Sequence, residues 1–339
     1  MVLTMLFCDP FYFGTIFLMC ASQNQNAAKP QHLPSDLKEG PAFLQGGVKK
    51  ISPLLLTDLS KLYDRRAKRL HLLSQEAKED GGEYLKFLEK MVLIQKELLA
   101  QYPLDKEDIS KIKSWFEAKK DPSPEDLEKE PFLHKIYKAF FQKISPLIQE
   151  EHLSSLKKLS DNAAYFAQQS AYLLTGNFAQ CDAAAAVPLW ACLSLCWAQA
   201  ATDYAKEFEE EKTIVTSQAH CPFCGTPAVA DMVLTGQQEG LRYEQCALCE
   251  TRWHKVRSIC PECLGSEHLD YWSIEEKMPS IEIESCADCK TYSKIFRLDR
   301  NPNYELCSDD LASVVLDALV EEKGFSRRTL NPFVLSFPT

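Results

Sequence analysis

The fold is decided by four Cys-x-x-Cys turns: Cys221-Pro-Phe-Cys224, Cys246-Ala-Leu-Cys249, Cys260-Pro-Glu-Cys263 and Cys286-Ala-Asp-Cys289. They hold eight of the 14 cysteines in the chain. Each turn places two thiolates on one side of a tight loop, and two facing turns supply the tetrahedral four-sulfur shell that a divalent metal requires. Neighbouring turns predict two sites for one iron or zinc ion each, formed by Cys221, Cys224, Cys246 and Cys249 and by Cys260, Cys263, Cys286 and Cys289. Crossed pairing needs longer loops but stays open.

The spacing of the turns indicates one module written twice. The first two turns are separated by 21 residues and the last two by 22, with ten residues between the pairs. Glu244 to Thr251 matches Glu284 to Thr291 at five positions. We therefore expect two tandem rubredoxin-like or zinc-ribbon modules over residues 217–258 and 259–300. Their expected strands are 228–234, 240–245 and 252–259, then 269–274, 281–284 and 292–298.

Residues 48–216 carry the apolar spacing of helices and predict an all-α bundle. The first helix is expected from about Leu55, with Gly81-Gly82 ending it, and further helices over 83–101, 105–119, 132–149, 152–174 and 187–211. The last of these carries an apolar stripe and two cysteines that we interpret as a buried face: Trp190, Leu193, Trp197, Cys192 and Cys196. Residues 1–47 are expected to be an apolar leader and linker outside the fold.

Residues 301–339 are expected to form a helix and tail that pack on the ribbons or on the bundle. Ser308-Asp309-Asp310 is typical of a helix N-terminus, where acidic side chains face the positive end of the dipole, and Gly324 is expected to end the helix. The predicted fold class is therefore α+β, with an N-terminal all-α bundle, two tandem ribbons and a C-terminal helix.

Composition excludes several classes of function. The 339-residue chain has a formal net charge of -10, and residues 219–339 contain 12 Lys plus Arg against 19 Asp plus Glu, which disfavours nucleic acid as a partner. No nucleotide-binding, hydrolase or metalloprotease motif occurs, so no enzyme activity is predicted. The apolar run from Phe11 to Ala21 is too short to cross a bilayer. Clustered cysteines indicate a reducing compartment, and we expect a cytoplasmic protein without membrane insertion.

The motifs together resemble one known family. Cys221-Pro-Phe-Cys-Gly225, Gly240-Leu-Arg-Tyr243, Trp253-His-Lys-Val-Arg257, Glu284-Ser-Cys-Ala-Asp-Cys289 and Asp309-Asp-Leu-Ala312 with Asn331-Pro-Phe333 are similar to the formate dehydrogenase accessory proteins of the FdhE type. The resemblance covers about residues 50 to 335. It departs from the family at Arg252, where an acidic residue is usual, and at the extra thiol of Cys307.

The resemblance implies a bacterial protein that binds the catalytic subunit of a respiratory formate dehydrogenase and helps it to become active before export. It also implies iron in rubredoxin-like sites. Five residues of the shared motifs are candidates for contact with a partner or for support of a metal ligand: Trp253, His254, Arg257, Asp309 and Asp310. From the local pattern alone, His254 is more often a plain strand residue, and Asp309 and Asp310 are favoured as helix-capping residues.

Three alternatives stay open from the sequence. The four-sulfur sites can be purely structural, because small ribbons have little core of their own. The protein can be an autonomous rubredoxin-like electron carrier. A zinc-ribbon module that binds nucleic acid is less favoured by the charge. The sequence does not specify the oligomeric state.

Overall fold

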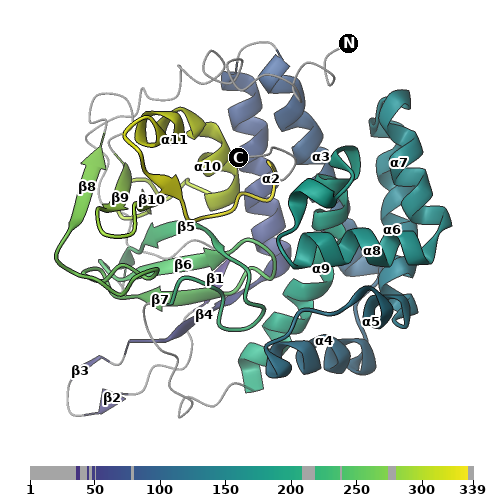
Figure 1. Cartoon of the computed structure of the whole chain (residues 1–339), viewed down its shortest axis with the longest axis horizontal. Helices are drawn as coiled ribbons and strands as arrows, with labels where there is room; N and C mark the ends of the chain where they lie inside the picture. The colour runs from purple at the N-terminus through teal and green to yellow at the C-terminus, as the bar shows by residue number, and fades with distance from the viewer. Residues whose placement is uncertain are drawn as a thin grey trace.

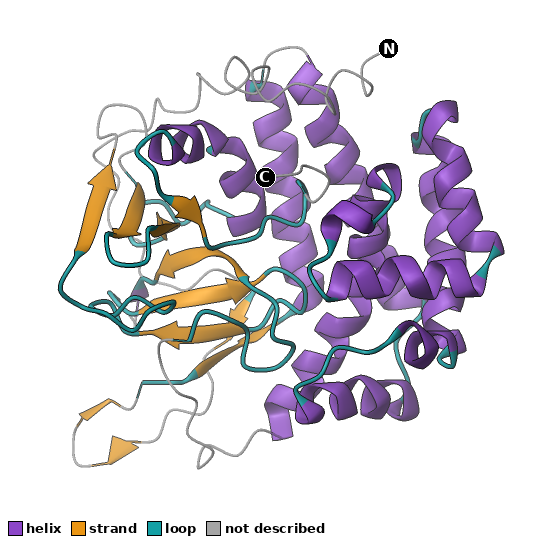
Figure 2. Ribbon diagram, viewed as in Figure 1, coloured by secondary structure: helices purple, strands orange, loops and turns teal. Residues whose placement is uncertain are grey.

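The computed structural model describes residues 36–38, 44–45, 48–49, 51–77, 80–207, 218–236, 239–273 and 280–334. The apolar leader expected over residues 1–21 lies outside this part of the chain. Figure 2 shows the N-terminal helices on one side of the molecule and the strands on the other, with the two C-terminal helices beside the strands. The predicted α+β class is confirmed: a helical N-terminal region precedes a sheet with two four-cysteine clusters and C-terminal helices.

The first two helices form an antiparallel hairpin, α2 (Leu59–Glu76) and α3 (Asp80–Gln101). The predicted helix start at Leu55 was wrong, because Leu54–Thr57 is strand β4 and Asp58 caps α2 by accepting a bond from the Lys61 backbone N–H. Gly82 lies within α3 rather than ending α2. A Cβ on Gly82 would lie 3.1 Å from the Ser74 carbonyl oxygen, so glycine permits the close approach of the two helices.

The remaining helices of this region surround one central helix. The expected segment 152–174 is broken at Asn162, whose side chain caps the second half by accepting from the Tyr165 N–H. The helices are α4 (Lys106–Ala118), α5 (Pro124–Glu128), α6 (Pro131–Ile144), η2 (Ser145–Leu147), α7 (Glu150–Asp161), α8 (Ala163–Leu174), η3 (Phe178–Gln180) and the central α9 (Ala183–Glu207).

Helix α9 is the core of the helical side. Its predicted buried face is confirmed, since Trp190, Leu193, Trp197 and both cysteines, Cys192 and Cys196, are buried. Within the described residues, Ala183–Lys206 is the one stretch long and apolar enough to cross a bilayer, and 83% of the apolar window in it is buried inside the fold. A core helix shows the same length and composition.

The two predicted ribbons are fused into one sheet. The first contributes β5 (Ala228–Val233), β6 (Arg242–Cys246) and β7 (Arg252–Lys255), and the second β8 (Leu269–Ser273), β9 (Ile281–Cys286) and β10 (Thr291–Arg297). Strands β5 and β10 pair in parallel, with Ile295 opposite Asp231. The ribbons are therefore two halves of one continuous sheet and not separate modules, as Figure 1 shows.

The sheet recruits strands from both ends of the chain. Its order is β1-β4-β7-β6-β5-β10-β9-β8, with β11 (Ser326–Arg327) beside β10. Strand β4 pairs with β7, placing Leu55 opposite Arg252, and β1 (Leu37–Lys38) pairs with β4. Part of the expected linker thus belongs to the sheet. A separate small hairpin joins β2 (Leu44–Gln45) and β3 (Val48–Lys49).

The C-terminal segment folds back on the sheet as two short helices, α10 (Leu306–Ala312) and α11 (Val314–Glu321). The expected helix N-terminus around Ser308-Asp309-Asp310 is present, but it begins slightly earlier: Glu305 is the N-cap and accepts from the Ser308 N–H. Lys294 of β10 forms buried ion pairs with Asp310 at 2.9 Å and Asp317 at 2.7 Å. These pairs fix both helices to the sheet.

Candidate metal centres

The first cluster joins the turn before β5 to the turn between β6 and β7. The Sγ atom of Cys249 lies 3.5 Å from that of Cys221 and 3.5 Å from that of Cys224, and Cys224 Sγ lies 3.4 Å from Cys246 Sγ. The second cluster repeats this arrangement, with 3.7 Å between Cys260 and Cys289 and 3.6 Å between Cys263 and Cys286. We call the clusters site 1 and site 2. Each consists of two neighbouring turns, so the turns are not crossed.

Both clusters fit a tetrahedral metal ion. A Zn–S bond of about 2.3 Å places the sulfur atoms at the corners of a tetrahedron with edges of about 3.8 Å. The observed separations are close to this value, and in each cluster all four sulfur atoms lie within 4.8 Å of one another. Four sulfur ligands fill the coordination shell of zinc or of rubredoxin-type iron, so either ion fits.

The backbone of the turns is adapted to this geometry. The residue after the second cysteine of every turn has a left-handed conformation, with φ of 74° at Gly225, 60° at Glu250, 60° at Leu264 and 58° at Lys290. This conformation costs a non-glycine residue free energy. It turns the chain sharply enough for the N–H of Leu264 to reach the Cys260 carbonyl at 2.9 Å.

Hydrogen bonds to sulfur support the ligands. The N–H groups of Leu248 and Cys249 lie 3.3 Å and 3.4 Å from Cys246 Sγ. Thr251 and Thr291 occupy equivalent positions in the two modules, and each hydroxyl lies 3.1 Å from the sulfur two residues earlier, Cys249 or Cys289. Donors directed at sulfur stabilise thiolate charge, which metal binding requires.

Site 1 is enclosed by the helical region. Cys221, Cys246 and Cys249 are buried and Cys224 is half-buried. Helix α9 holds the second turn from outside: Trp190 Nε1 donates to the Ala247 carbonyl at 3.0 Å, and Ser194 Oγ donates to the Leu248 carbonyl at 2.7 Å. The buried face of α9 therefore holds the second turn of site 1 in place through hydrogen bonds to its backbone.

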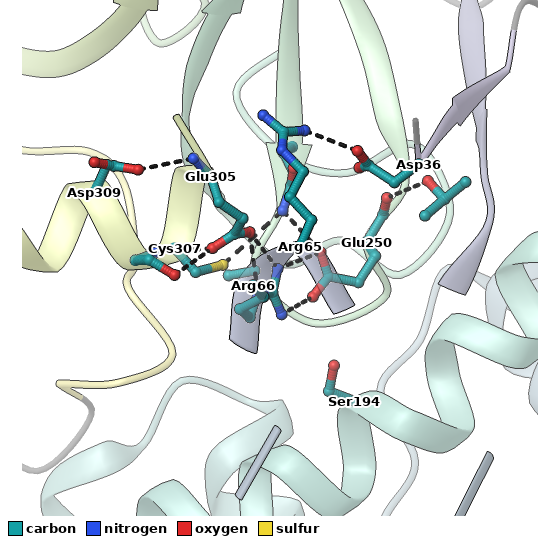
Figure 3. A network of polar contacts seen from close by, with 12 residues as sticks. Asp36, Arg65, Arg66, Ser194, Glu250, Glu305, Cys307 and Asp309 are labelled. Carbon is teal, nitrogen blue, oxygen red and sulfur yellow. Dashed lines mark hydrogen bonds and ion pairs between the residues drawn. The ribbon is translucent and has the colours of Figure 1, made fainter. Parts of the chain in front are cut away.

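Buried charges tie the same turn to two other elements. Arg66 of α2 forms a bidentate pair with Glu250, at 2.8 Å and 3.1 Å, and donates from Nε to Glu305 at 3.0 Å (Figure 3). Burial raises the pKa of Glu305, but the Arg66 charge and the hydrogen bonds from Ser308 together hold that pKa below its usual range. One guanidinium thus joins α2, site 1 and the start of α10.

The predicted contact residues lie mostly inside the protein. Trp253 is buried and His254 is 9% exposed. Asp309 is buried and pairs with Arg69 of α2 at 2.6 Å, and Asp310 is buried in the ion pairs of Lys294 and Arg327. The burial of these four residues favours a role inside the protein over contact with a partner. Of the five candidates, Arg257 is the one with an exposed side chain. Within the part of the chain that the structure describes, none of the five is hydrogen-bonded to a cysteine sulfur.

Arg252 is also internal, so its departure from the family pattern does not alter a surface. Its guanidinium donates to Gln245 Oε1, Thr57 Oγ1 and Asp36 Oδ2, each at 2.9 Å. Burial raises the pKa of Asp36, but the charges of Arg252 and Arg65, together with hydrogen bonds to the carboxylate, hold that pKa below its usual range. Arg252 thereby fixes the N-terminal segment to the first ribbon.

Sequence reasoning missed Arg66, Arg69 and Glu250. A signal was present: Arg66 and Arg69 continue the apolar spacing of Leu62, which places two cations on the buried face of α2. Charges at core positions require partners. Nothing in the local pattern identified Glu250 and Asp309 as those partners.

A cleft of about 500 Å³ is lined by the helical region and by the first turn of site 1. The half-buried ligand Cys224 lies on its wall, and the exposed side chains of Lys119 and Lys120 add positive charge. Its other lining residues include Trp115, Phe116, Phe178, Trp190, Trp197, Phe223, Arg327 and Arg328. The cleft thus combines aromatic surface, cations and access to a site 1 ligand.

The fold and the two clusters define an α+β protein of zinc-ribbon-like character whose ribbons share a sheet. Three family models match the chain: FdhE, N-terminal, over residues 51–212; FdhE, central domain, over 220–257; and FdhE, C-terminal domain, over 256–334. The chain therefore belongs to the FdhE family.

Individual relatives agree with this assignment. An FdhE homologue of Citrobacter koseri is 37% identical over 294 residues, and one of Klebsiella pneumoniae is 36% identical over 290 residues; each match covers 84% of this chain and 91% of the relative. The crystal structure of the FdhE protein from Pseudomonas aeruginosa is similar with a TM-score of 0.66 and 28% identity, over 83% of this chain and 98% of that one.

Proposed function

We propose that this protein is a cytoplasmic accessory factor that binds the catalytic subunit of a respiratory formate dehydrogenase and promotes its maturation, without being an enzyme itself. The observation that carries the proposal is the match to FdhE models across the helical, central and C-terminal regions together with both four-cysteine clusters. Neither nucleic acid nor membrane insertion is part of it.

We propose further that each cluster holds one iron or zinc ion. The sulfur separations of 3.4 to 3.7 Å and the hydrogen bonds to sulfur support metal binding. A bound ion would cross-link strands that are otherwise joined by short turns, and iron would in addition supply a one-electron couple. Site 1 supports the contact between ribbon and helices, because α9 and Arg66 both hold its second turn.

The cleft beside Cys224 is the surface we propose for the client. Aromatic side chains such as Trp115 and Phe178 offer apolar contact area, and Lys119 and Lys120 favour an acidic segment of the partner. The chain as a whole has a formal net charge of -10, so an acidic segment is repelled away from these lysines. The segment would then contact both the helical region and site 1.

The deciding experiment is anaerobic affinity purification of the tagged protein from formate-grown cells, with identification of retained proteins and metal. Near-stoichiometric recovery of a formate dehydrogenase catalytic subunit is expected. The double variant Lys119→Glu/Lys120→Glu should lose the subunit, whereas Lys135→Glu/Lys138→Glu on α6, outside the cleft, should retain it. Recovery of metal without the subunit, although it is present in the lysate, would favour the electron-carrier alternative.

A further inference from the structure

The two sites differ in their access to solvent. In site 1, three sulfur ligands are buried and the half-buried Cys224 faces the cleft. In site 2, Cys263 is exposed and Cys289 is half-buried, and the adjoining Leu264 side chain is 65% exposed. An incoming ligand can therefore reach Cys263 from bulk solvent. No helix holds the turns of site 2 among the hydrogen bonds of the described residues in the way that α9 holds site 1.

Two further metal-ligating side chains lie on the exposed side of site 2. His268 Nδ1 is 2.8 Å from Asp288 Oδ1, and the two side chains are 60% and 43% exposed. Asp288 belongs to the second turn of site 2. Its other oxygen faces Gly265, where a Cβ would lie 3.0 Å from Asp288 Oδ2 and 3.3 Å from Cys263 Sγ. The Asp288 carboxylate and the exposed Cys263 thiol therefore both lie against the backbone of Gly265.

This arrangement suits the stepwise transfer of a divalent ion. Carboxylate oxygen and neutral imidazole nitrogen are ordinary zinc ligands, and two of them bind more weakly than four thiolates. An ion held there is already partly dehydrated beside Cys263. Release of the ion follows the same steps in reverse, and Cys263 is the first thiolate to leave the ion.

We propose that site 2 is the exchangeable metal site of this protein and that His268 and Asp288 are a transfer pair that passes a divalent cation to and from Cys263. Site 1 retains its ion. The inference rests on the proposed occupancy of both clusters by metal and is independent of client binding.

The first test is a chelator chase of the full-length protein loaded with two equivalents of zinc. Zinc is withdrawn with 4-(2-pyridylazo)resorcinol while N-ethylmaleimide traps the freed thiols, and the labelled cysteines are identified by peptide mass spectrometry. A fast release of one equivalent with labelling of Cys260, Cys263, Cys286 and Cys289 is expected, followed by slow release from site 1. Release of both ions at one rate, or site 1 first, would overturn the proposal. Wild-type protein that binds fewer than two zinc ions would remove its premise.

The second test separates transfer from simple clamping of the turn. The variant His268→Ala/Asp288→Asn should slow both zinc uptake and release at site 2 at least fivefold, and leave the equilibrium zinc affinity unchanged. A pair that only clamps the turn would release zinc faster when removed. The matched control is His71→Ala/Glu89→Gln, an exposed histidine–carboxylate pair at 3.1 Å on α2 and α3, for which neither rate should change. Faster or unchanged release in the site 2 variant would overturn the transfer role.

Discussion

At the scale of single residues, the helical and sheet halves are joined by buried ion pairs. Arg66 has two carboxylate partners, Glu250 and Glu305, and all three side chains are at most 3% exposed. Removing one member of such a group leaves the others charged and desolvated, which costs more than the intact pair contributes. The interface is therefore sensitive to the loss of this one side chain.

Replacement of Arg66 by alanine should lower the free energy of unfolding by about 3 to 5 kcal/mol, because it leaves two buried carboxylates unpaired. Urea denaturation followed by circular dichroism measures the change. The control is Lys157→Ala, which removes an exposed i,i+4 pair with Asp161 and should cost at most about 0.5 kcal/mol. Similar losses in the two variants would contradict the assignment of Arg66 as a buried link.

His254 should make the protein sensitive to acid. Burial lowers its pKa below the ordinary 6.5, and its Nδ1 atom is buried without a hydrogen-bond partner. As the pH falls through about 6.5, the unfolded chain binds a proton that the folded chain does not, so stability is lost as the pH falls. Between pH 7.5 and 5.5, thermal melting should therefore drop more in wild type than in His254→Gln. The same slope in both proteins would show that His254 contributes nothing to it.

Sequence reasoning at this scale was most successful where chemistry imposes a spacing. The eight clustered cysteines were identified, and their neighbouring pairing is the one in the structure. The pairing of Arg66 with Glu250 was not, because an ion pair between residues 184 positions apart leaves no local pattern. The same applies to Asp36 and Arg252, which meet only after β1 and β7 have joined the sheet.

At the scale of elements, the Cys-x-x-Cys turn is a unit with a fixed backbone requirement. Only the first turn has glycine at its left-handed position, Gly225, whereas Leu264 pays a conformational cost there. Leu264→Gly should raise the free energy of unfolding by about 0.5 to 1 kcal/mol, since relief of about 1 to 2 kcal/mol of strain exceeds the added entropy of the unfolded chain. The reverse change in site 1, Gly225→Leu, should lower it. Denaturation of the zinc-loaded proteins measures both, and the same sign for both would contradict this account.

Local pattern predicted the six ribbon strands well, because short β-like runs lie between the Cys-x-x-Cys turns in the sequence. It failed at Leu54–Thr57, where the apolar residues of a short strand also fit the spacing of the following helix. It also could not show that β5 and β10 pair. That contact joins strands from different modules, and the repeated sequence pattern indicates only which strands pair within one module.

At the scale of the whole molecule, the shared sheet changes what the loss of one metal should do. Independent ribbons would unfold one at a time. Here site 1 contacts α9 directly and α2 through Arg66, whereas site 2 lies at the end of the sheet that carries β8. The two sites should therefore differ in how far a defect spreads.

Cys221→Ser and Cys263→Ser should each lose one zinc ion per chain, but with different structural reach. Hydrogen exchange followed by mass spectrometry should show loss of protection in β5–β7 and in α9 for Cys221→Ser, because the turn held by Ser194 and Trp190 is released. For Cys263→Ser the loss should be confined to β8, β9 and their turns. Cys196→Ser is the control: this thiol is buried in α9 but belongs to neither cluster, so both zinc ions should remain. Equal zinc loss from Cys196→Ser would refute the ligand assignment, and deprotection of α9 in Cys263→Ser would show that the shared sheet transmits the defect from either site.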